Sequence, residues 1–195
     1  MKYIFCLFFL SCAIDVDSNH LSTFGTSYTL DIITWNIENF PKTDSTVDYL
    51  IDIILNINAD IIAVQEIKDE DAFNLLATLL GSNWISYKSN SSYYGNLGYL
   101  INSETISISG SPTIILEEHE DVFVYRQPYL IEFSFNEKDF FIINNHFKCC
   151  GDGIISDSDY WDEEYRRKQA SALLEQYVSE NLDEERVIIL GDLND

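Results

Sequence analysis

The feature that most constrains the fold is a change in the spacing of apolar residues along the chain. Segments 44–56 and 71–80 carry apolar side chains three and four positions apart, which is typical of helices that bury one face. Short apolar runs at 28–37 and 60–65 each precede one of these segments and are typical of buried strands. This part of the chain therefore predicts strands that alternate with helices and a sheet covered by those helices.

After residue 84 the pattern changes to extended segments. Runs rich in β-branched and aromatic residues predict strands at 84–87, 97–101, 106–116, 122–125, 129–135 and 140–145. Residues 136–139 (NEKD) are typical of a hairpin turn between the last two. A helix is predicted over 163–181 and a strand over 186–190. Since 195 residues suit a single domain, we expect one α/β domain with its sheets covered by helices.

The chain is strongly acidic, with 33 Asp and Glu against 11 Lys and Arg and a formal net charge of −22. A chain of this charge lacks the broad basic surface that grips the phosphate backbone of nucleic acids. An anionic substrate must then be met by a local site, where a metal ion would supply positive charge. The acidity also fits a surface that serves only solubility.

The first eleven residues differ in composition from the rest. Lys2 is followed by an apolar run over 3–10, which is too short to cross a bilayer because a span needs about 20 residues. The run is typical of a signal peptide over 1–11, and Ser11-Cys12 resembles a bacterial lipoprotein signal with lipid on Cys12. An ordinary short signal peptide or a misassigned start codon would explain the same residues.

We therefore expect an exported protein, either a lipoprotein of the periplasm, outer membrane or cell surface, or a secreted protein. The polar residues 12–28 are expected to form a tether, and 29–195 the folded domain. If Cys6 and Cys12 are used in export, the adjacent Cys149 and Cys150 remain. The pair would bond to cysteines outside the chain, stay reduced or form a strained ring. No His/Cys spacing predicts zinc.

Polar residues with short side chains stand where predicted strands end. Asn36 ends the first strand, Glu66 follows the second, His146 ends a later strand, and Asp192 and Asn194 follow the last strand. Ligands of α/β proteins collect where several strands end, so we expect these residues at one site. Amide and carboxylate oxygens are hard ligands that suit Mg²⁺ or Ca²⁺. Each residue alone has an ordinary structural explanation, and the hypothesis rests on their joint occurrence.

Six stretches give the chain a resemblance to a known family. They are TWNIENF (34–40), ADIIAVQEI (59–67), VYRQPYLIEF (124–133), IINNHFK (142–148), RRKQASALLEQYV (166–178) and VIILGDLND (187–195). The sequence resembles the endonuclease/exonuclease/phosphatase superfamily, the deoxyribonuclease I-like fold, and NNHFKCCGDG resembles a bacterial subgroup of it. The resemblance implies a four-layer α/β sandwich. It also implies a metal-dependent phosphodiester hydrolase that uses Mg²⁺, or else Ca²⁺ or Mn²⁺.

The resemblance implies roles for individual residues. Glu66 would be the metal-binding carboxylate, with Asn36 beside it holding metal or phosphate. His146 would contact the scissile phosphate and serve as an acid, and Asp192 would orient the attacking water or aid the leaving group. Hydrolysis places negative charge on phosphate oxygens, which a divalent ion and positioned donors stabilise.

The resemblance also implies roles for Asn194 and Arg126, and the chain departs from the family pattern in two places. Asn194 would hold the phosphate or the neighbouring aspartate, and Arg126 would be a basic residue near the site or a partner in an ion pair. Some nucleases carry a glutamate near 96–99 that supports the histidine, whereas this chain has no carboxylate there. The family continues beyond Gly-Asp-x-Asn with a motif that supplies a base, and the sequence given stops at Asp195. We therefore expect a domain incomplete at its C-terminal end, with exposed apolar residues there and little activity.

Three functions are open at this point. The first is an exported endonuclease or exonuclease, favoured by Tyr93, Tyr94 and a basic cluster at Lys148 and 166–168. The second is a lipid or inositol-phosphate phosphoesterase of the same fold, which would need exposed apolar loops. The third is an inactive domain that binds a partner, although the intact candidate residues argue against it. The expected partner is nucleic acid or another phosphodiester, and no residue pattern points to a protein partner.

Overall fold

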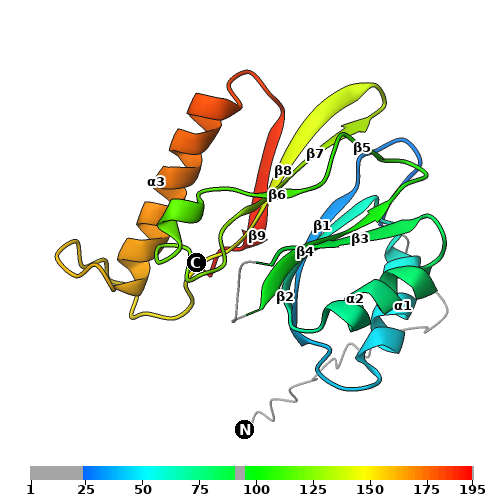
Figure 1. Cartoon of the computed structure of the whole chain (residues 1–195), viewed down its shortest axis with the longest axis horizontal. Helices are drawn as coiled ribbons and strands as arrows, with labels where there is room; N and C mark the ends of the chain where they lie inside the picture. Colours follow the sequence, from blue (N-terminus) through cyan, green and yellow to red (C-terminus); the bar gives the residue numbers. More distant parts are fainter. Residues whose placement is uncertain (1–23, 91–94, 195) are drawn as a thin grey trace, which may run out of the picture.

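The computed structural model describes residues 24–90 and 95–194. Two β-sheets pack face to face, and helices cover their outer faces on opposite sides of the molecule (Figure 1). This arrangement confirms the predicted four-layer α/β sandwich. The predicted signal peptide over 1–11, residues 12–23 of the tether, and the tyrosines Tyr93 and Tyr94 lie outside the described residues.

The first sheet has the strand order β1-β2-β4-β3. Its elements are β1 (Ile32–Phe40), α1 (Thr46–Ile57), β2 (Ile61–Ile67), α2 (Glu70–Leu80), β3 (Trp84–Lys88) and β4 (Asn96–Asn102). β1 and β2 are parallel, which requires a crossover connection, and α1 provides it. β4 runs antiparallel to β2 and β3. The carboxyl ends of β1 and β2, where Asn36 and Glu66 were predicted, thus lie at the same edge.

The second sheet has the order β5-β7-β8-β9, with β6 also pairing to β7. Its elements are β5 (Ser107–Ile108), β6 (Thr113–Ile114), the 3-10 turn Glu117–His119, β7 (Tyr129–Phe135), β8 (Lys138–His146), α3 (Glu163–Asn181) and β9 (Val187–Asp192). β7 and β8 form the predicted hairpin, and β9 runs parallel to β8. Within the described residues β9 is an edge strand of this sheet, and Ile189 on it is 43% exposed.

Three apolar clusters separate the four layers. One lies between α1, α2 and the first sheet, with Phe40, Ile54, Phe73, Leu76 and Leu100 among its buried members. The second lies between the sheets and includes Ile61, Leu97, Tyr99, Ile131 and Phe133. The third lies between the second sheet and α3 and includes Phe123, Ile143, Ala170 and Leu174. Both faces of each sheet are therefore buried, which explains why the central strands are apolar throughout.

Two predicted strands differ from the structure. Residues 122–125 form turns, and Val124 and Tyr125 have positive φ angles of 54° and 57°. Val122 and Phe123 are buried in the cluster under α3, so the apolar run anchors a loop and pairs with no strand. The single strand predicted over 106–116 is two short strands, because Gly110 and Pro112 interrupt it and proline lacks a backbone donor.

The end of the expected tether is bound to the domain. The backbone N–H groups of Phe24 and Gly25 both donate to the Ile57 carbonyl, at 3.0 and 2.9 Å. These residues thus belong to the folded body. Over 24–90 and 95–194, no helix combines the length and the apolar character that a membrane crossing requires.

Buried hydrogen bonds join the two sheets beneath the edge where the predicted site residues lie. The Tyr99 hydroxyl, on β4, donates to the Tyr129 carbonyl at 2.6 Å and accepts from the Asn144 backbone N–H at 3.1 Å. Asn144 Nδ2, on β8, donates to the carbonyls of Val64 and Gly98, each at 3.0 Å. Burial raises the pKa of Tyr99 well above its usual value, so the hydroxyl stays protonated. These bonds fix the position of one sheet on the other.

Tyr99→Phe tests how much these inter-sheet bonds contribute. The variant removes one hydroxyl and leaves a buried carbonyl and a buried N–H without that partner, so we expect the free energy of unfolding to fall by about 1–3 kcal/mol. Urea denaturation measures the change. Tyr49→Phe is the matched control, because Tyr49 is 66% exposed on α1 and should change stability little. Equal losses from both variants would contradict a bonding role for the Tyr99 hydroxyl.

Candidate active site

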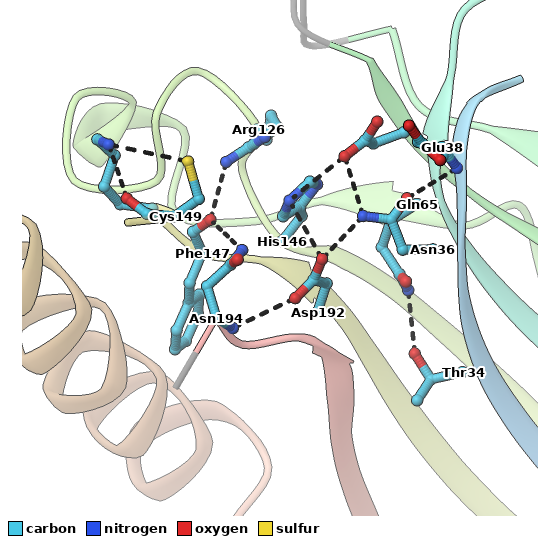
Figure 2. Close-up of polar contacts among 12 residues, drawn as sticks. Thr34, Asn36, Glu38, Gln65, Arg126, His146, Phe147, Cys149, Asp192 and Asn194 are labelled. Atoms are coloured by element: carbon cyan, nitrogen blue, oxygen red, sulfur yellow. Dashed lines mark hydrogen bonds and ion pairs between the residues drawn. The ribbon is translucent and has the colours of Figure 1, made fainter. Parts of the chain in front are cut away.

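The predicted site residues meet where strands of both sheets end. Asn36 Nδ2, on β1, donates to Glu66 Oε1 at 2.9 Å and to Asp192 Oδ2 at 2.8 Å (Figure 2). Glu66 is on β2 of the first sheet, whereas Asp192 ends β9 of the second, and β1 lies in contact with β9. One amide therefore joins two carboxylates across the seam between the sheets.

A bulge in β2 directs Glu66 into the site. Regular alternation along β2 places Ile62 and Val64 toward the helices, and Glu66 would follow them to that face. The pairing shifts between Val64 and Ile67, and Glu66 takes a positive φ of 67°. Ile67 then fills the helix-side core, and Glu66 turns toward Asn36. A non-glycine residue held at positive φ carries backbone strain, which is common at functional sites.

Both oxygens of Glu66 are held. Besides the bond from Asn36 to Oε1, the Asn39 backbone N–H donates to Oε2 at 3.0 Å. Asn36 itself is oriented by the Glu38 backbone N–H, which donates to its Oδ1 at 2.9 Å. The loop after β1 therefore fixes the carboxylate and the amide together.

The close packing of β9 against β8 before Asp192 requires glycine at position 191. Gly191 lies beside Asn145 in the parallel pair of β9 and β8, with φ at 140°. A Cβ at this position would lie 2.0 Å from the Asn145 carbonyl oxygen, so a larger residue would push β9 away. Asp192 Oδ1 then accepts from the Asn194 backbone N–H at 3.3 Å, which holds the turn after the strand.

His146 is buried between the two carboxylates. Its Nε2 lies 3.6 Å from Asp192 Oδ2 and 4.0 Å from Glu66 Oε1, and the side chain is 4% exposed. Among the described residues its Nδ1 has no hydrogen-bond partner, which agrees with the lack of a carboxylate at 96–99. The pKa of His146 is lowered to about 4, chiefly by burial and also by the charge of Arg126. The charges of Asp192 and Glu66 act in the opposite direction and raise this pKa. The imidazole is therefore neutral at pH 7.

Arg126 contacts the backbone of the residue that follows His146. Its Nη2 donates to the Phe147 carbonyl at 2.8 Å, and Asn194 Nδ2 donates to the same oxygen at 3.1 Å (Figure 2). The Arg126 side chain forms no ion pair among the described residues, and the residue is 8% exposed. The predicted basic residue and the predicted asparagine thus position the chain segment that follows His146.

The predicted basic cluster is largely neutralised by local partners. Arg167 bonds to two carbonyls and lies 3.4 Å from Glu164, and Lys168 lies 2.6 Å from Asp157. Arg166 is buried and donates to the Asp121 carbonyl. Lys148 Nζ lies 3.4 Å from Glu163 Oε1. This surface is therefore less cationic than its sequence suggests.

Sequence reasoning missed the residues that support the site from below. Gln65 Nε2 donates to Asn144 Oδ1 at 2.7 Å and to Thr34 Oγ1 at 3.1 Å, and both Gln65 and Asn144 are buried. The available signal was a polar residue inside an apolar strand, in AVQEI and in IINNH. Such a residue needs buried hydrogen-bond partners, so it indicates a specific polar contact between the two sheets.

The chain belongs to the Endonuclease/Exonuclease/phosphatase family, whose family model matches residues 33–195. Members of this family are generally hydrolytic phosphoesterases and typically depend on a divalent metal. No curated protein sequence matches the chain.

Solved structures share the fold. D. rerio TDP2 complexed with single strand DNA product has a TM-score of 0.67 at 16% identity, with 85% of this chain and 60% of that chain covered. The human Nocturnin catalytic domain with bound sulfate anion has a TM-score of 0.62 at 15% identity, with 85% and 64% covered. The endonuclease/exonuclease/phosphatase from Bacteroides vulgatus has a TM-score of 0.61 at 16% identity, with 83% and 64% covered. The chain thus spans less than two thirds of the length of each of these chains.

Arg126→Met tests the electrostatics around the histidine. Because the Arg126 charge disfavours the imidazolium, its removal should raise the pKa of His146 from about 4 toward the usual 6.5. NMR titration of the imidazole in metal-free protein measures this shift. Arg186→Met is the control, because Arg186 lies over the Phe140 ring and next to Val187 at the opposite end of β9 from Asp192. An unchanged His146 pKa in Arg126→Met would contradict this origin of the shift.

Proposed function

We propose that this chain carries the catalytic site of a metal-dependent phosphodiester hydrolase, an endonuclease or exonuclease acting on nucleic acid. The observation that carries the proposal is the convergence of Glu66 and Asp192 on the Asn36 amide at the seam between the sheets. His146 Nε2 faces both carboxylates there. The family membership of residues 33–195 supports the same chemistry.

The donor set fits a hard divalent cation. Two carboxylates approach one neutral amide nitrogen, and the neighbouring imidazole is neutral at pH 7, so their negative charges lack a contacting cation among the described residues. Glu66 and Asn36 would hold the ion, with Asp192 beside them. Mg²⁺ is the ion that we propose, since carboxylate and amide oxygens suit it, and Ca²⁺ or Mn²⁺ would fit the same ligands. When bound, the ion would polarise the phosphoryl oxygens and offset the developing charge.

The protein groups would act around the scissile phosphate. Neutral His146 would donate from Nε2 to a phosphate oxygen, because Nε2 faces the two carboxylates whereas Nδ1 has no partner among the described residues. Asp192 Oδ2 would orient the attacking water or the leaving oxygen. Arg126 and Asn194 would hold the Phe147 carbonyl, and through it the backbone of His146. Arg126 and Asn194 would therefore be residues that position His146.

The surroundings of the site bear on the substrate. A cavity of about 390 Å³ opens next to it, lined by Phe147, Ile155, Arg167, Lys168 and Leu193 among others. An aromatic pair, Tyr160 and Trp161, lies on the loop between β8 and α3 and would stack on bases. The neighbouring D. rerio TDP2 structure holds single strand DNA product, which favours nucleic acid as the substrate class.

A specific observation favours a second candidate, a phosphoesterase for lipid head groups. The same loop, yellow to orange in Figure 1, exposes Ile154 at 69%, Ile155 at 51% and Trp161 at 61%. Exposed apolar side chains of this kind insert into the lipid interface. The pairing of Arg166, Arg167 and Lys168 with local groups also leaves less positive charge for a nucleic-acid backbone.

Glu66→Gln tests the proposed metal chemistry in the full-length protein. A neutral amide replaces the anionic ligand, so at limiting Mg²⁺ the hydrolysis of a single-stranded DNA oligonucleotide should fall by about a hundredfold. Calorimetric titration should show that Mg²⁺ binding weakens in parallel. Glu132→Gln, an exposed change on β7, is the matched control and should leave both unchanged.

The outcomes of this experiment separate the candidates. Metal binding and hydrolysis at wild-type levels in Glu66→Gln would contradict the ligand role. Hydrolysis of phospholipid vesicles with no hydrolysis of the oligonucleotide would support the lipid phosphoesterase. A wild-type protein that binds no Mg²⁺ and cleaves neither substrate would support the inactive binding domain.

We also propose export, with lipid attached at Cys12. The support is the apolar run over 3–10, the Ser11-Cys12 pair and the polar residues behind it. Cys12→Ala should move the native protein from the membrane fraction to the soluble fraction, as measured by immunoblotting, while Cys149→Ala should not. An unmodified Cys12 in the mass spectrum of the native protein would contradict this proposal.

A further inference from the structure

The segment that follows His146 carries two cysteines whose sulfur atoms touch. Cys149 and Cys150 are the free cysteines of the described residues, and their Sγ atoms are 3.0 Å apart. Cys150 is exposed and Cys149 is half-buried. Neighbouring side chains of an extended segment point to opposite sides, so this contact requires a special backbone.

A held turn provides that backbone. Cys150 has a φ of 73° and Gly151 a φ of 99°, and both values lie in the left-handed region. Arg167 Nη1, from α3, donates to the carbonyls of Lys148 and Cys150 at 3.0 and 2.9 Å. Lys148 Nζ donates to the Cys149 carbonyl at 2.8 Å. Arg167 and the preceding Lys148 thus hold the backbone in which the two sulfur atoms meet.

The charges around the pair distinguish the two thiols. Lys148 Nζ lies 4.0 Å from Cys149 Sγ, and the charge of Arg126 also acts on this sulfur. The Cys150 thiol donates to Cys149 Sγ, and this bond, together with the charge of Cys149, raises the pKa of Cys150. A thiolate is the reactive form of cysteine. The lysine beside Cys149 Sγ and the raised pKa of Cys150 make Cys149 the sulfur that attacks.

We propose that Cys149 and Cys150 are a reversible dithiol–disulfide pair that exchanges with low-molecular-weight disulfides. The Cys149 thiolate attacks one sulfur of the disulfide, whose S–S bond breaks, and the first small thiolate leaves. Cys150 then loses its proton and attacks Cys149 Sγ, which forms the intrachain S–S bond and releases the second small thiolate. The protons of the two cysteines pass to the two leaving thiolates, so the pair loses two electrons and the small disulfide gains them.

The geometry makes this disulfide labile. Adjacent Cα atoms across a trans peptide are about 3.8 Å apart, which is shorter than the 4.4–6.8 Å of common disulfides. A strained and exposed disulfide is reduced more easily than a structural one. The accessible surface of Cys150 gives the reductant entry. Of the three states open to this pair, the proposal selects the intrachain ring, formed and reopened by exchange.

Peptide mapping of the full-length protein tests this inference without any measurement of hydrolysis. After treatment with oxidised glutathione and alkylation of free thiols, trypsin releases residues 149–166, because Lys148 and Arg166 bound them. We expect this peptide unalkylated and lighter by two hydrogens than the dithiol form. Millimolar reduced glutathione should then restore two alkylation sites.

Two variants identify the order of attack. Cys150→Ser should stop at a stable glutathione adduct on Cys149, whereas Cys149→Ser should form its adduct more slowly. The double variant Cys149→Ser/Cys150→Ser is the folding control and should keep the wild-type unfolding midpoint. In the wild-type protein, a peptide that stays alkylated, a lasting glutathione adduct or a bond to a second chain would each overturn the proposal. Because the readout is a mass, failure of the proposed hydrolase function would leave it unaffected.

Discussion

The site depends on the buried hydrogen bonds that hold one sheet against the other. Apolar packing alone allows two sheets to slide, whereas Asn144 Nδ2 finds its two carbonyl partners only at one position of β8 on β2 and β4. Gln65 completes this contact through Asn144 Oδ1. Buried amides without partners are costly, so these bonds select one register between the sheets. Only in that register does Asn36 on the first sheet reach Asp192 on the second.

The second constraint is electrostatic. Glu66 and Asp192 approach the same amide nitrogen, and the neutral imidazole between them supplies no charge. Like charges this close raise each other's energy unless a cation neutralises them. The chain has a net charge of −22, so positive charges near the two carboxylates are few. The guanidinium of Arg126 donates to the Phe147 carbonyl and contacts neither carboxylate. An acidic protein of this kind would therefore meet an anionic phosphodiester through a bound divalent ion rather than through its surface.

The sequence predicted most of the helices and central strands, because the spacing of apolar residues is regular over whole segments. The helices at 46–57, 70–80 and 163–181 and the central strands lie close to their expected positions. Residues 122–125 were wrongly predicted as a strand, since an apolar run reports burial and not backbone pairing. The bulge at Glu66 and the pairing of Arg166 and Arg167 were also beyond prediction, because both depend on partners distant in sequence. The ends of the predicted strands identified the candidate residues. Only the structure shows that Arg126 donates to the backbone carbonyl of Phe147.

The segment from His146 to Cys150 links the candidate active site to the cysteine pair. Its carbonyls are held in turn by Arg126 and Asn194 at Phe147 and by Arg167 at Lys148 and Cys150. A ring closed between Cys149 and Cys150, as proposed, would strain the peptide between them, and the Cys150 carbonyl beside this peptide is bonded to Arg167. The Phe147 carbonyl has its own two donors, which lie on the site side of the segment. Such strain would reach α3 through Arg167, whereas the Phe147 carbonyl next to His146 would keep its bonds from Arg126 and Asn194.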